Sequence, residues 1–159
     1  MIDFSIQNIS VADIPLLTEL HKKSFPHGFW SQSQLTSTIE LKTTIALCLR
    51  EKNSDALLGF ILVQCLDAEA EILTICVAPS HRKLSLGSAL LDAALGAARL
   101  SGASKMFLEV AEDNQAAITF YEKNGFSVTG LRKGYYKRDN LYIDTKILYR
   151  NVKEKSVEC

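Results

Sequence analysis

Two helices are predicted in the first forty residues from the spacing of apolar positions. The first has four positions that recur at helical spacing and form one face: Ile14, Leu17, Leu20 and His21. Ser10 and Asp13 form a capping-box pattern in front of this segment, which marks a helix start. Ser31 and Gln34 repeat the pattern and predict a second helix that extends to about residues 39–41.

The middle of the chain changes to the period of β-strands. Three strands are predicted, at Thr44–Arg50, Leu57–Leu66 and Ala70–Ala78. Gly59 marks a candidate β-bulge in the second of them. Residues 72–77 are apolar on both faces, so we expect the third strand to be central and buried on both sides. Pro79 ends it.

The second half of the chain alternates between helices and strands. The predicted elements are a helix at Ser85–Leu100, a strand at Lys105–Ala111, a helix at Asn114–Asn124, and two strands at Phe126–Leu131 and Leu141–Tyr149. Gly102 and Gly125 suit the C-terminal caps of the two helices. The order α, α, β, β, β, α, β, α, β, β predicts an α/β single domain, a mixed sheet with helices on both faces. We expect this domain at residues 1–150 and a solvated tail at 151–159.

Composition and charge exclude several classes of protein. The chain has 159 residues with 18 basic and 18 acidic side chains, which argues against a nucleic-acid coat or a polybasic membrane patch. No apolar run approaches the ~20 residues that span a bilayer, and the start lacks a signal-peptide pattern, so a soluble cytoplasmic protein is expected. The histidines and cysteines show no metal-ligand spacing, so no metal is expected. The cysteines are interpreted as free thiols: Cys48, Cys65, Cys76 and Cys159.

The segment 82–89, which turns from a buried strand into a helix, is the first place that can carry chemistry. A helix N-terminus beside Arg82 and Lys83 suits a phosphate group, because its first amides are unpaired and its dipole end is positive. An ordinary strand-to-helix turn explains the pattern equally well. The segment matches neither the Walker loop nor the Rossmann fingerprint, since Gly87 is its only glycine.

Glu109, Asn114 and Tyr121 are the other candidates. Glu109 is predicted to lie on the strand face opposite three apolar residues: Met106, Leu108 and Val110. A partly desolvated carboxylate there can act as a general base, while an exposed strand position is the simpler interpretation. Asn114 and Tyr121 lie two helical turns apart on the same side of a helix. Asn114 is either a ligand-binding amide or a helix cap, and Tyr121 is either a functional phenol or an aromatic residue of the core.

Together these segments resemble the GNAT N-acetyltransferases, and within them the ribosomal-protein-alanine N-acetyltransferases. The matching segments are the strand Glu71–Pro79, the loop Arg82–Ala89, Leu108–Val110, Asn114 and Ala117, Tyr121, Gly125 and Phe126, with Phe25, Pro26, Trp30 and Ser31 before them and Arg132, Tyr135 and Tyr136 after them. The resemblance covers nearly the whole chain and departs from the family at Ser85, where glycine is usual. It implies a mostly antiparallel sheet with a splayed parallel strand pair and helices on both faces.

The resemblance also implies acetyl-CoA as cosubstrate, with no metal. The implied acetyl-CoA-binding residues are Ile75, Cys76, Val77, Lys83, Leu84, Ser85, Leu86, Gly87, Ser88 and Asn114. Glu109 would be the general base and Tyr121 the general acid, and the acceptor amine would attack the thioester directly. An acyl-enzyme on Cys76 is disfavoured, because its strand is expected to be buried and no histidine base is placed beside it by the sequence.

The expected acceptor is the N-terminal α-amine of a protein, most directly the alanine of a ribosomal protein. An α-amine, with a pKa near ~7.7–8.0, needs roughly 3–4 kcal/mol less deprotonation work than a lysine near ~10.4. Trp30, Tyr135 and Tyr136 are candidates for the acceptor groove, or they pack at the end of the sheet. A lysine or small-molecule amine as acceptor, and a non-catalytic acyl-CoA-binding module, are the alternatives. No nucleic-acid or membrane partner is expected.

Overall fold

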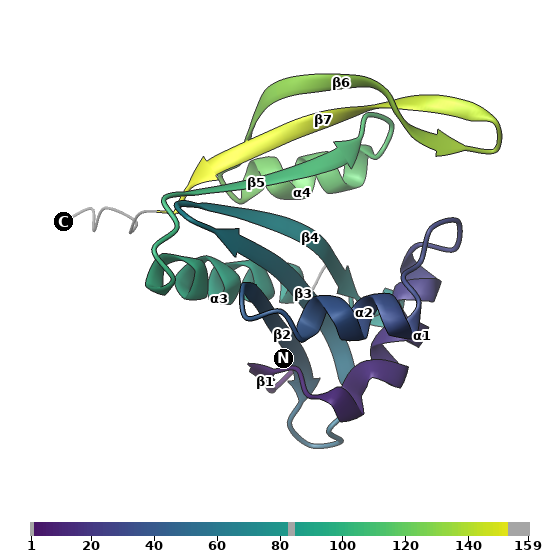
Figure 1. Ribbon diagram of the computed structural model, residues 1–159. Helices are drawn as coiled ribbons and strands as arrows, with labels where there is room; N and C mark the ends of the chain where they lie inside the picture. The colour runs from purple at the N-terminus through teal and green to yellow at the C-terminus, as the bar shows by residue number, and fades with distance from the viewer. Residues whose placement is uncertain (1, 83–84, 153–159) are drawn as a thin grey trace.

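The computed structural model describes residues 2–82 and 85–152, in which seven strands form one sheet (Figure 1). The strands are β1 (Phe4–Asn8), β2 (Thr44–Glu51), β3 (Leu57–Leu66), β4 (Glu69–Val77), β5 (Lys105–Ala111), β6 (Ser127–Arg138) and β7 (Leu141–Asn151). The helices are α1 (Ile14–Ser24), α2 (Gln32–Ile39), α3 (Leu86–Leu100) and α4 (Gln115–Lys123), with the short 3-10 helices η1 (Val11–Asp13) and η2 (Pro79–His81). The predicted α/β fold is therefore confirmed.

The strand order is β1-β2-β3-β4-β5-β7-β6, and only β4 and β5 run parallel among these neighbours. Two strands differ from the sequence prediction. β1 is missing from the predicted order, because it is a five-residue edge strand with no fully buried position. β6 continues to Arg138 instead of ending at Leu131, because two irregularities in its register with β7 interrupt the alternation of side chains.

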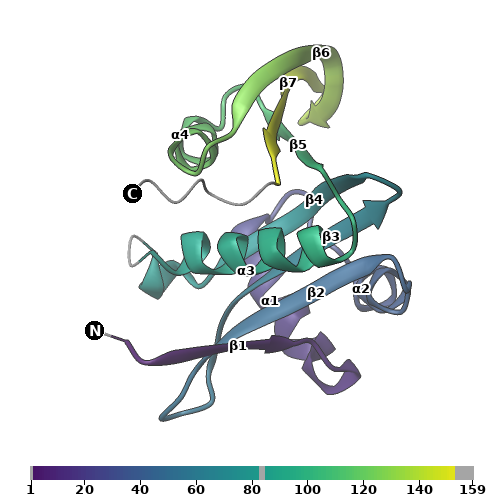
Figure 2. The ribbon, with the colours of Figure 1, turned by 90° about the vertical axis from the view of Figure 1, so that its left-hand side faces the viewer.

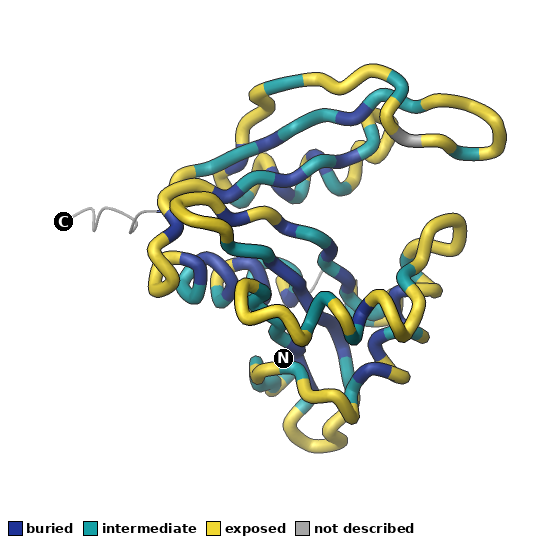
Figure 3. Tube along the Cα trace, in the orientation of Figure 1, coloured by how far each residue is buried: buried dark blue, intermediate teal, exposed yellow. Residues whose placement is uncertain are grey.

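Helices cover both faces of the sheet (Figure 2). α3 packs on one face over β2, β3 and β4, and Ile118 and Tyr121 of α4 belong to the same core. α1 and α2 cover the opposite face around Leu17, Leu35 and Phe60. The buried positions of α1 are the four predicted ones: Ile14, Leu17, Leu20 and His21. Figure 3 shows the buried residues concentrated between these layers.

A β-bulge in β4 changes the direction of its side chains. The register with β3 skips Leu73, because Ile72 and Thr74 pair with consecutive residues of β3. Before the bulge Ile72 packs in the core under α3, and after it Cys76 packs in the core under α1 and α2. The strand is central, as predicted, but the expectation of burial on both faces is wrong: fully buried and partly buried positions alternate in its second half.

The partly buried face of β4 follows from its short pairing with β5. The parallel register covers only residues 69–71 of β4 and 105–107 of β5, whereas β5 pairs with β7 along residues 105–111. Beyond Glu71 the two parallel strands therefore separate, and each keeps its other neighbour. This is the splayed strand pair that the resemblance implied, and it leaves one edge of β4 and one edge of β5 without a strand partner.

The last strand of the sheet is followed by one more described residue. β7 ends at Asn151, and the next residue, Val152, is buried. Residues 153–159, which include Cys159 and most of the predicted tail, lie outside the described residues.

Candidate active site

The N-terminus of α3 follows the end of β4 that separates from β5. Ser85 is the N-cap residue and has a left-handed backbone, with φ +62°. The first amide to bond back into the helix is that of Ala89, which donates to the Ser85 carbonyl at 3.1 Å. The amides of residues 86–88 precede this bond and are available to an anion. Lys83 and Leu84, which were expected to take part, lie outside the described residues.

Close packing explains Gly87 in the first turn of this helix. A Cβ atom at this position would lie 3.2 Å from two ring atoms of Phe120 in α4. A larger side chain would push α4 away from α3. The N-terminus of α3 is thus held against α4, next to the opening between the parallel strands.

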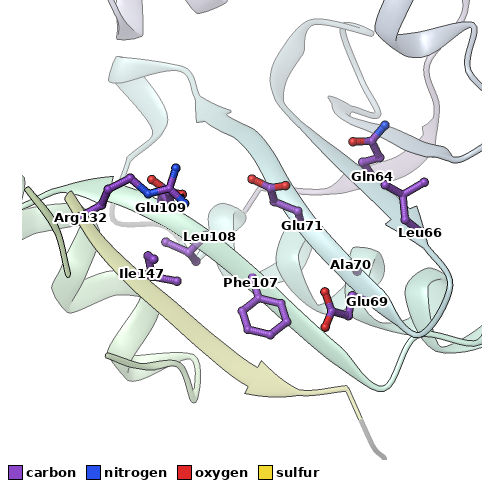
Figure 4. Close-up of a pocket in the computed structure, with 10 residues that line it drawn as sticks. All are labelled: Gln64, Leu66, Glu69, Ala70, Glu71, Phe107, Leu108, Glu109, Arg132 and Ile147. Carbon is purple, nitrogen blue, oxygen red and sulfur yellow. The ribbon is translucent and has the colours of Figure 1, made fainter. Parts of the chain in front are cut away.

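Glu109 lies in an open pocket of about 250 Å³ on the face of the sheet that α1 and α2 cover elsewhere (Figure 4). The pocket is lined by Gln64, Leu66, Glu69, Ala70, Glu71, Phe107, Leu108, Glu109, Arg132 and Ile147. Arg132 Nη2 forms an ion pair with Glu109 Oε1 at 2.9 Å, and Thr145 Oγ1 donates a hydrogen bond to Glu109 Oε2 at 3.2 Å. Both carboxylate oxygens are therefore held in place.

The predicted orientation of Glu109 is confirmed. The side chains of Met106, Leu108 and Val110 are buried on the opposite face of β5. Arg132 was noticed in the sequence only as part of a motif, and the pairing with Glu109 depends on β6 and β7, which follow much later in the chain. Thr145 carried no signal in the sequence.

Glu71 is a second carboxylate in the pocket and was missed as a site residue. Burial and the negative charge of Glu109 raise the pKa of Glu71, and Arg132 partly offsets this. Glu71 is also the last residue of β4 that pairs with β5, so it lies where the opening begins. The alternation of Glu69 and Glu71 along an otherwise apolar strand is the signal that could have identified it.

Tyr121 and Asn114 lie on α4 and at its start. The Tyr121 ring packs edge-on against Phe120 and Phe126, with centroid distances of 5.2 and 5.6 Å. Burial, with a smaller effect from Cys76, raises the pKa of Tyr121 far above its usual range, so the phenol keeps its proton. Asn114 Oδ1 accepts a hydrogen bond from the Ala117 amide at 3.2 Å, which confirms the helix-cap interpretation for that oxygen.

Cys76 lies in the splayed half of β4 and is 3% exposed. Burial raises the pKa of its thiol to about 12, against smaller opposing effects of Thr74, Ser24 and Arg82. A thiol of this kind is a poor nucleophile at neutral pH. The neighbouring Val77 carbonyl accepts a hydrogen bond from Arg82 Nε at 3.3 Å. Cys48, Cys65 and Cys76 are free thiols, as predicted.

The three aromatic candidates for the acceptor side come from two parts of the fold, the connection between α1 and α2 and the strand β6. Trp30 is partly buried against the core under α1 and α2. Tyr135 is 61% exposed, and the Arg132 guanidinium lies 4.5 Å from its ring centre, so this tyrosine is linked to Glu109 through Arg132. Tyr136 pairs with Ile143 in the β6–β7 ladder, and its side chain lies outside the described part of the structure.

Comparison with known proteins identifies the class. The model of the acetyltransferase (GNAT) family matches residues 14–126, and the chain belongs to this family. The ribosomal protein bS18-alanine N-acetyltransferase of Escherichia coli (strain K12) is 27% identical over 133 residues, which cover 83% of this chain and 86% of that protein.

Two solved structures share the fold. The crystal structure of the ribosomal-protein-S18-alanine N-acetyltransferase from Escherichia coli has a TM-score of 0.82 at 23% identity and covers 99% of both chains. The structure of Ard1 from Thermoplasma volcanium has a TM-score of 0.84 at 27% identity, over 95% of this chain and 99% of that chain.

The chain is therefore an acetyl-CoA-dependent N-acetyltransferase of the GNAT family, similar over most of its length to enzymes that acetylate the alanine of a ribosomal protein. This finding favours the enzyme over the non-catalytic binding module. Among the described residues, no helix is both long enough and apolar enough to cross a membrane.

Proposed function

We propose that this chain transfers the acetyl group of acetyl-CoA to the N-terminal α-amine of a protein, and that the preferred acceptor is the alanine at the N-terminus of a ribosomal protein. The observation that carries the proposal is the carboxylate of Glu109, fixed in an open pocket where β4 and β5 begin to separate. The similarity to the bS18-alanine enzyme supports this choice of acceptor.

The opening between β4 and β5 suits an extended thioester. The strand edge at residues 75–77 offers backbone groups to the pantetheine arm and to the acetyl carbonyl, because β5 no longer pairs there. The amides of residues 86–88 at the start of α3 suit the pyrophosphate, with Ser85 beside them and with Lys83 and Leu84 assigned by sequence alone. The amide nitrogen of Asn114 is proposed to bond acetyl-CoA nearby.

The chemical step forms one bond and breaks another. The acceptor nitrogen attacks the carbonyl carbon, so that a C–N bond forms and the C–S bond breaks without an acyl-enzyme. Glu109 takes the proton from the amine, directly or through one water molecule. Tyr121, whose phenol is kept protonated by burial, donates a proton to the departing sulfur.

An α-amine is the acceptor that one carboxylate can serve. With a pKa near ~7.7–8.0, a useful fraction of α-amines is neutral at cytoplasmic pH. A lysine amine, with a pKa near ~10.4, needs roughly 3–4 kcal/mol more free energy for its deprotonation. Trp30 on one side, and Tyr135 and Tyr136 on the other, are proposed to contact the first residues of the acceptor. Figure 1 shows the connection between α1 and α2, which carries Trp30, directed toward the β6–β7 hairpin.

A thiol-release assay with acetyl-CoA and short peptides that differ only in their first residue tests the proposal. We expect the highest kcat/KM for alanine, and loss of turnover when the peptide N-terminus is blocked while an internal lysine stays free. Glu109→Gln and Tyr121→Phe should each lower kcat about 10²–10⁴-fold. Both variants should still bind acetyl-CoA in calorimetry.

The controls separate the proposed roles from the choice of acceptor. Lys133→Gln changes a neighbouring exposed charge on β6 and should leave turnover within about twofold of wild type. If the blocked peptide or a small amine were turned over as fast as the peptide with a free N-terminus, the acceptor would be a lysine or a small-molecule amine and not the proposed α-amine. Full activity of both site variants would remove Glu109 and Tyr121 from their assigned roles.

A further inference from the structure

His21 is a buried polar residue that the proposed reaction does not use. It lies on the apolar face of α1 and is 2% exposed. Its ring is enclosed by Phe25, Trp30 and Phe60, with centroid distances of 4.8, 6.0 and 6.1 Å. These neighbours are aromatic, so the two polar ring nitrogens need hydrogen-bond partners elsewhere.

Both nitrogens of the ring are used, and they reach different elements. The Trp30 amide donates a hydrogen bond to His21 Nδ1 at 3.1 Å. Because Nδ1 is an acceptor, the single proton of the neutral ring is on Nε2, which donates to Thr74 Oγ1 at 3.1 Å. Burial lowers the pKa of His21 to about 4, so this neutral form is the one present at physiological pH.

Thr74 is the residue of β4 directly after the bulge at Leu73 and directly before residues 75–77. Its hydroxyl is 3.9 Å from Cys76 Sγ, so it contacts the splayed half of the strand. The imidazole therefore joins the α1–α2 connection to the start of the segment that is proposed to hold the acetyl group.

The α1–α2 connection makes few backbone hydrogen bonds to the rest of the protein. In residues 25–30 the Gly28 amide donates to the Phe25 carbonyl, and the Phe25 amide donates to the His21 carbonyl of α1. Among the described residues, the backbone of this segment makes no hydrogen bond to the sheet. Phe25 and Phe29 are 38% and 40% exposed, so their apolar contacts contribute little to fixing the position of this segment. The hydrogen-bonded path from Trp30 to β4 runs through His21.

We propose that His21 is a positioning residue for the acceptor. Through its hydrogen bonds to Trp30 and Thr74 it fixes the position of the α1–α2 connection relative to the splayed half of β4. This inference rests on the proposed function only in assigning residues 25–30 to the acceptor side. The link itself requires no assumption about the substrate.

Two substitutions break the link, one at the imidazole in its middle and one at its end on β4. His21→Phe keeps the ring contacts and removes both nitrogens, and Thr74→Val removes the hydroxyl with little change of shape. Thr74→Val loses one hydrogen bond of the link and should raise KM for the acceptor peptide about tenfold; His21→Phe loses both and should raise this KM at least as much. In both variants KM for acetyl-CoA and kcat should stay within about twofold. Thr74→Ser, which restores the hydroxyl, should recover the acceptor KM.

Trp30 is the chain's single tryptophan and gives a readout that does not depend on activity. In both variants its emission should shift to longer wavelength and its quenching by acrylamide should increase, whereas Thr74→Ser should resemble wild type. Leu95→Ala, in the core under α3, is the control for general loss of stability. It should change neither the tryptophan emission nor the KM for the acceptor peptide relative to the KM for acetyl-CoA.

The outcomes separate this inference from the proposed function. Unchanged emission in both variants overturns the link, and shifted emission with an unchanged acceptor KM overturns the positioning role. Equal changes in Leu95→Ala overturn it as well. The kinetic measurements use whichever amine the wild-type enzyme acetylates, so a preference for lysine counts against the proposed function alone.

Discussion

At the scale of single residues, two carboxylates in one pocket differ because of their partners. The Glu109 carboxylate is held by Arg132 and Thr145, whereas the side chain of Glu71 has no hydrogen bond or ion pair with a described residue. Glu71 feels the charge of Glu109 and is partly desolvated, so its pKa is raised. The pocket therefore combines one anchored carboxylate with one that accepts a proton more readily than an ordinary glutamate does.

Ser85 shows a local cost at the start of α3. A left-handed backbone costs a non-glycine residue about 1–2 kcal/mol, and the Ser85 side chain makes no capping hydrogen bond in return. Ser85→Gly removes this strain, and the greater unfolded-state entropy of glycine offsets part of the gain. The free energy of unfolding should therefore rise by roughly 0.5–1 kcal/mol in urea denaturation. Ser85→Ala, which keeps the strain, should show no gain. A loss of stability in the glycine variant would contradict the argument.

At the scale of elements, the shape of β4 depends on how closely β3 approaches it. A Cβ atom on Gly59 would lie 2.7 Å from the Cys76 carbonyl oxygen and 3.1 Å from a methyl group of Leu90. The register of β2 with β3 also shifts next to Gly59, which confirms the predicted bulge in this region. Only a glycine at this position allows β3 to pair closely with the part of β4 that no longer pairs with β5.

Gly59→Ala should therefore displace the backbone of β4. We expect the free energy of unfolding to fall by about 2 kcal/mol, as in other overpacked cores, when measured by chemical denaturation. Gly96→Ala is the matched control, since Gly96 lies within α3 with nothing within 4 Å of the added atom. That substitution should raise stability by about 0.5–1 kcal/mol. Similar effects of both changes would count against the steric explanation.

At the scale of the whole molecule, one buried group, His21, and one partly buried group, Asp13, make stability depend on pH. The His21 pKa falls from 6.5 to about 4 on folding, so between these values the unfolded chain binds more protons than the folded one. Stability is therefore full above about pH 6.5 and decreases as the pH falls. Burial raises the pKa of Asp13, but the Ser10 amide and Arg50 outweigh this and lower it, so further stability is lost at more acidic pH.

Urea denaturation at a series of pH values tests this linkage. Between pH 6.5 and 4 the wild-type free energy of unfolding should fall by roughly 3 kcal/mol through His21 alone. His21→Phe should lose most of this slope while keeping the further decline that Asp13 produces at more acidic pH. An unchanged slope in the variant would show that another group controls stability in this range.

Local pattern was sufficient for much of the fold. The capping boxes at Ser10 and Ser31, the apolar face of α1 and the orientation of Glu109 all follow from residues close in sequence, and the structure confirms each. Such features depend on the 3.6-residue and two-residue periods of the backbone, which any segment carries by itself. The family resemblance rests on the same short segments and is confirmed by the comparisons.

Tertiary structure decided how the pieces meet. The pairing of Arg132 with Glu109, the charge of Glu109 on Glu71, and the bond from His21 to Thr74 join residues from different elements. Each depends on strand register, and a shift of one residue turns a side chain to the other face. The bulge at Leu73 makes such a shift in β4. The amino-acid sequence by itself thus determined which elements form and which residue types they present, and the packing of those elements determined which charges and hydrogen bonds share one site.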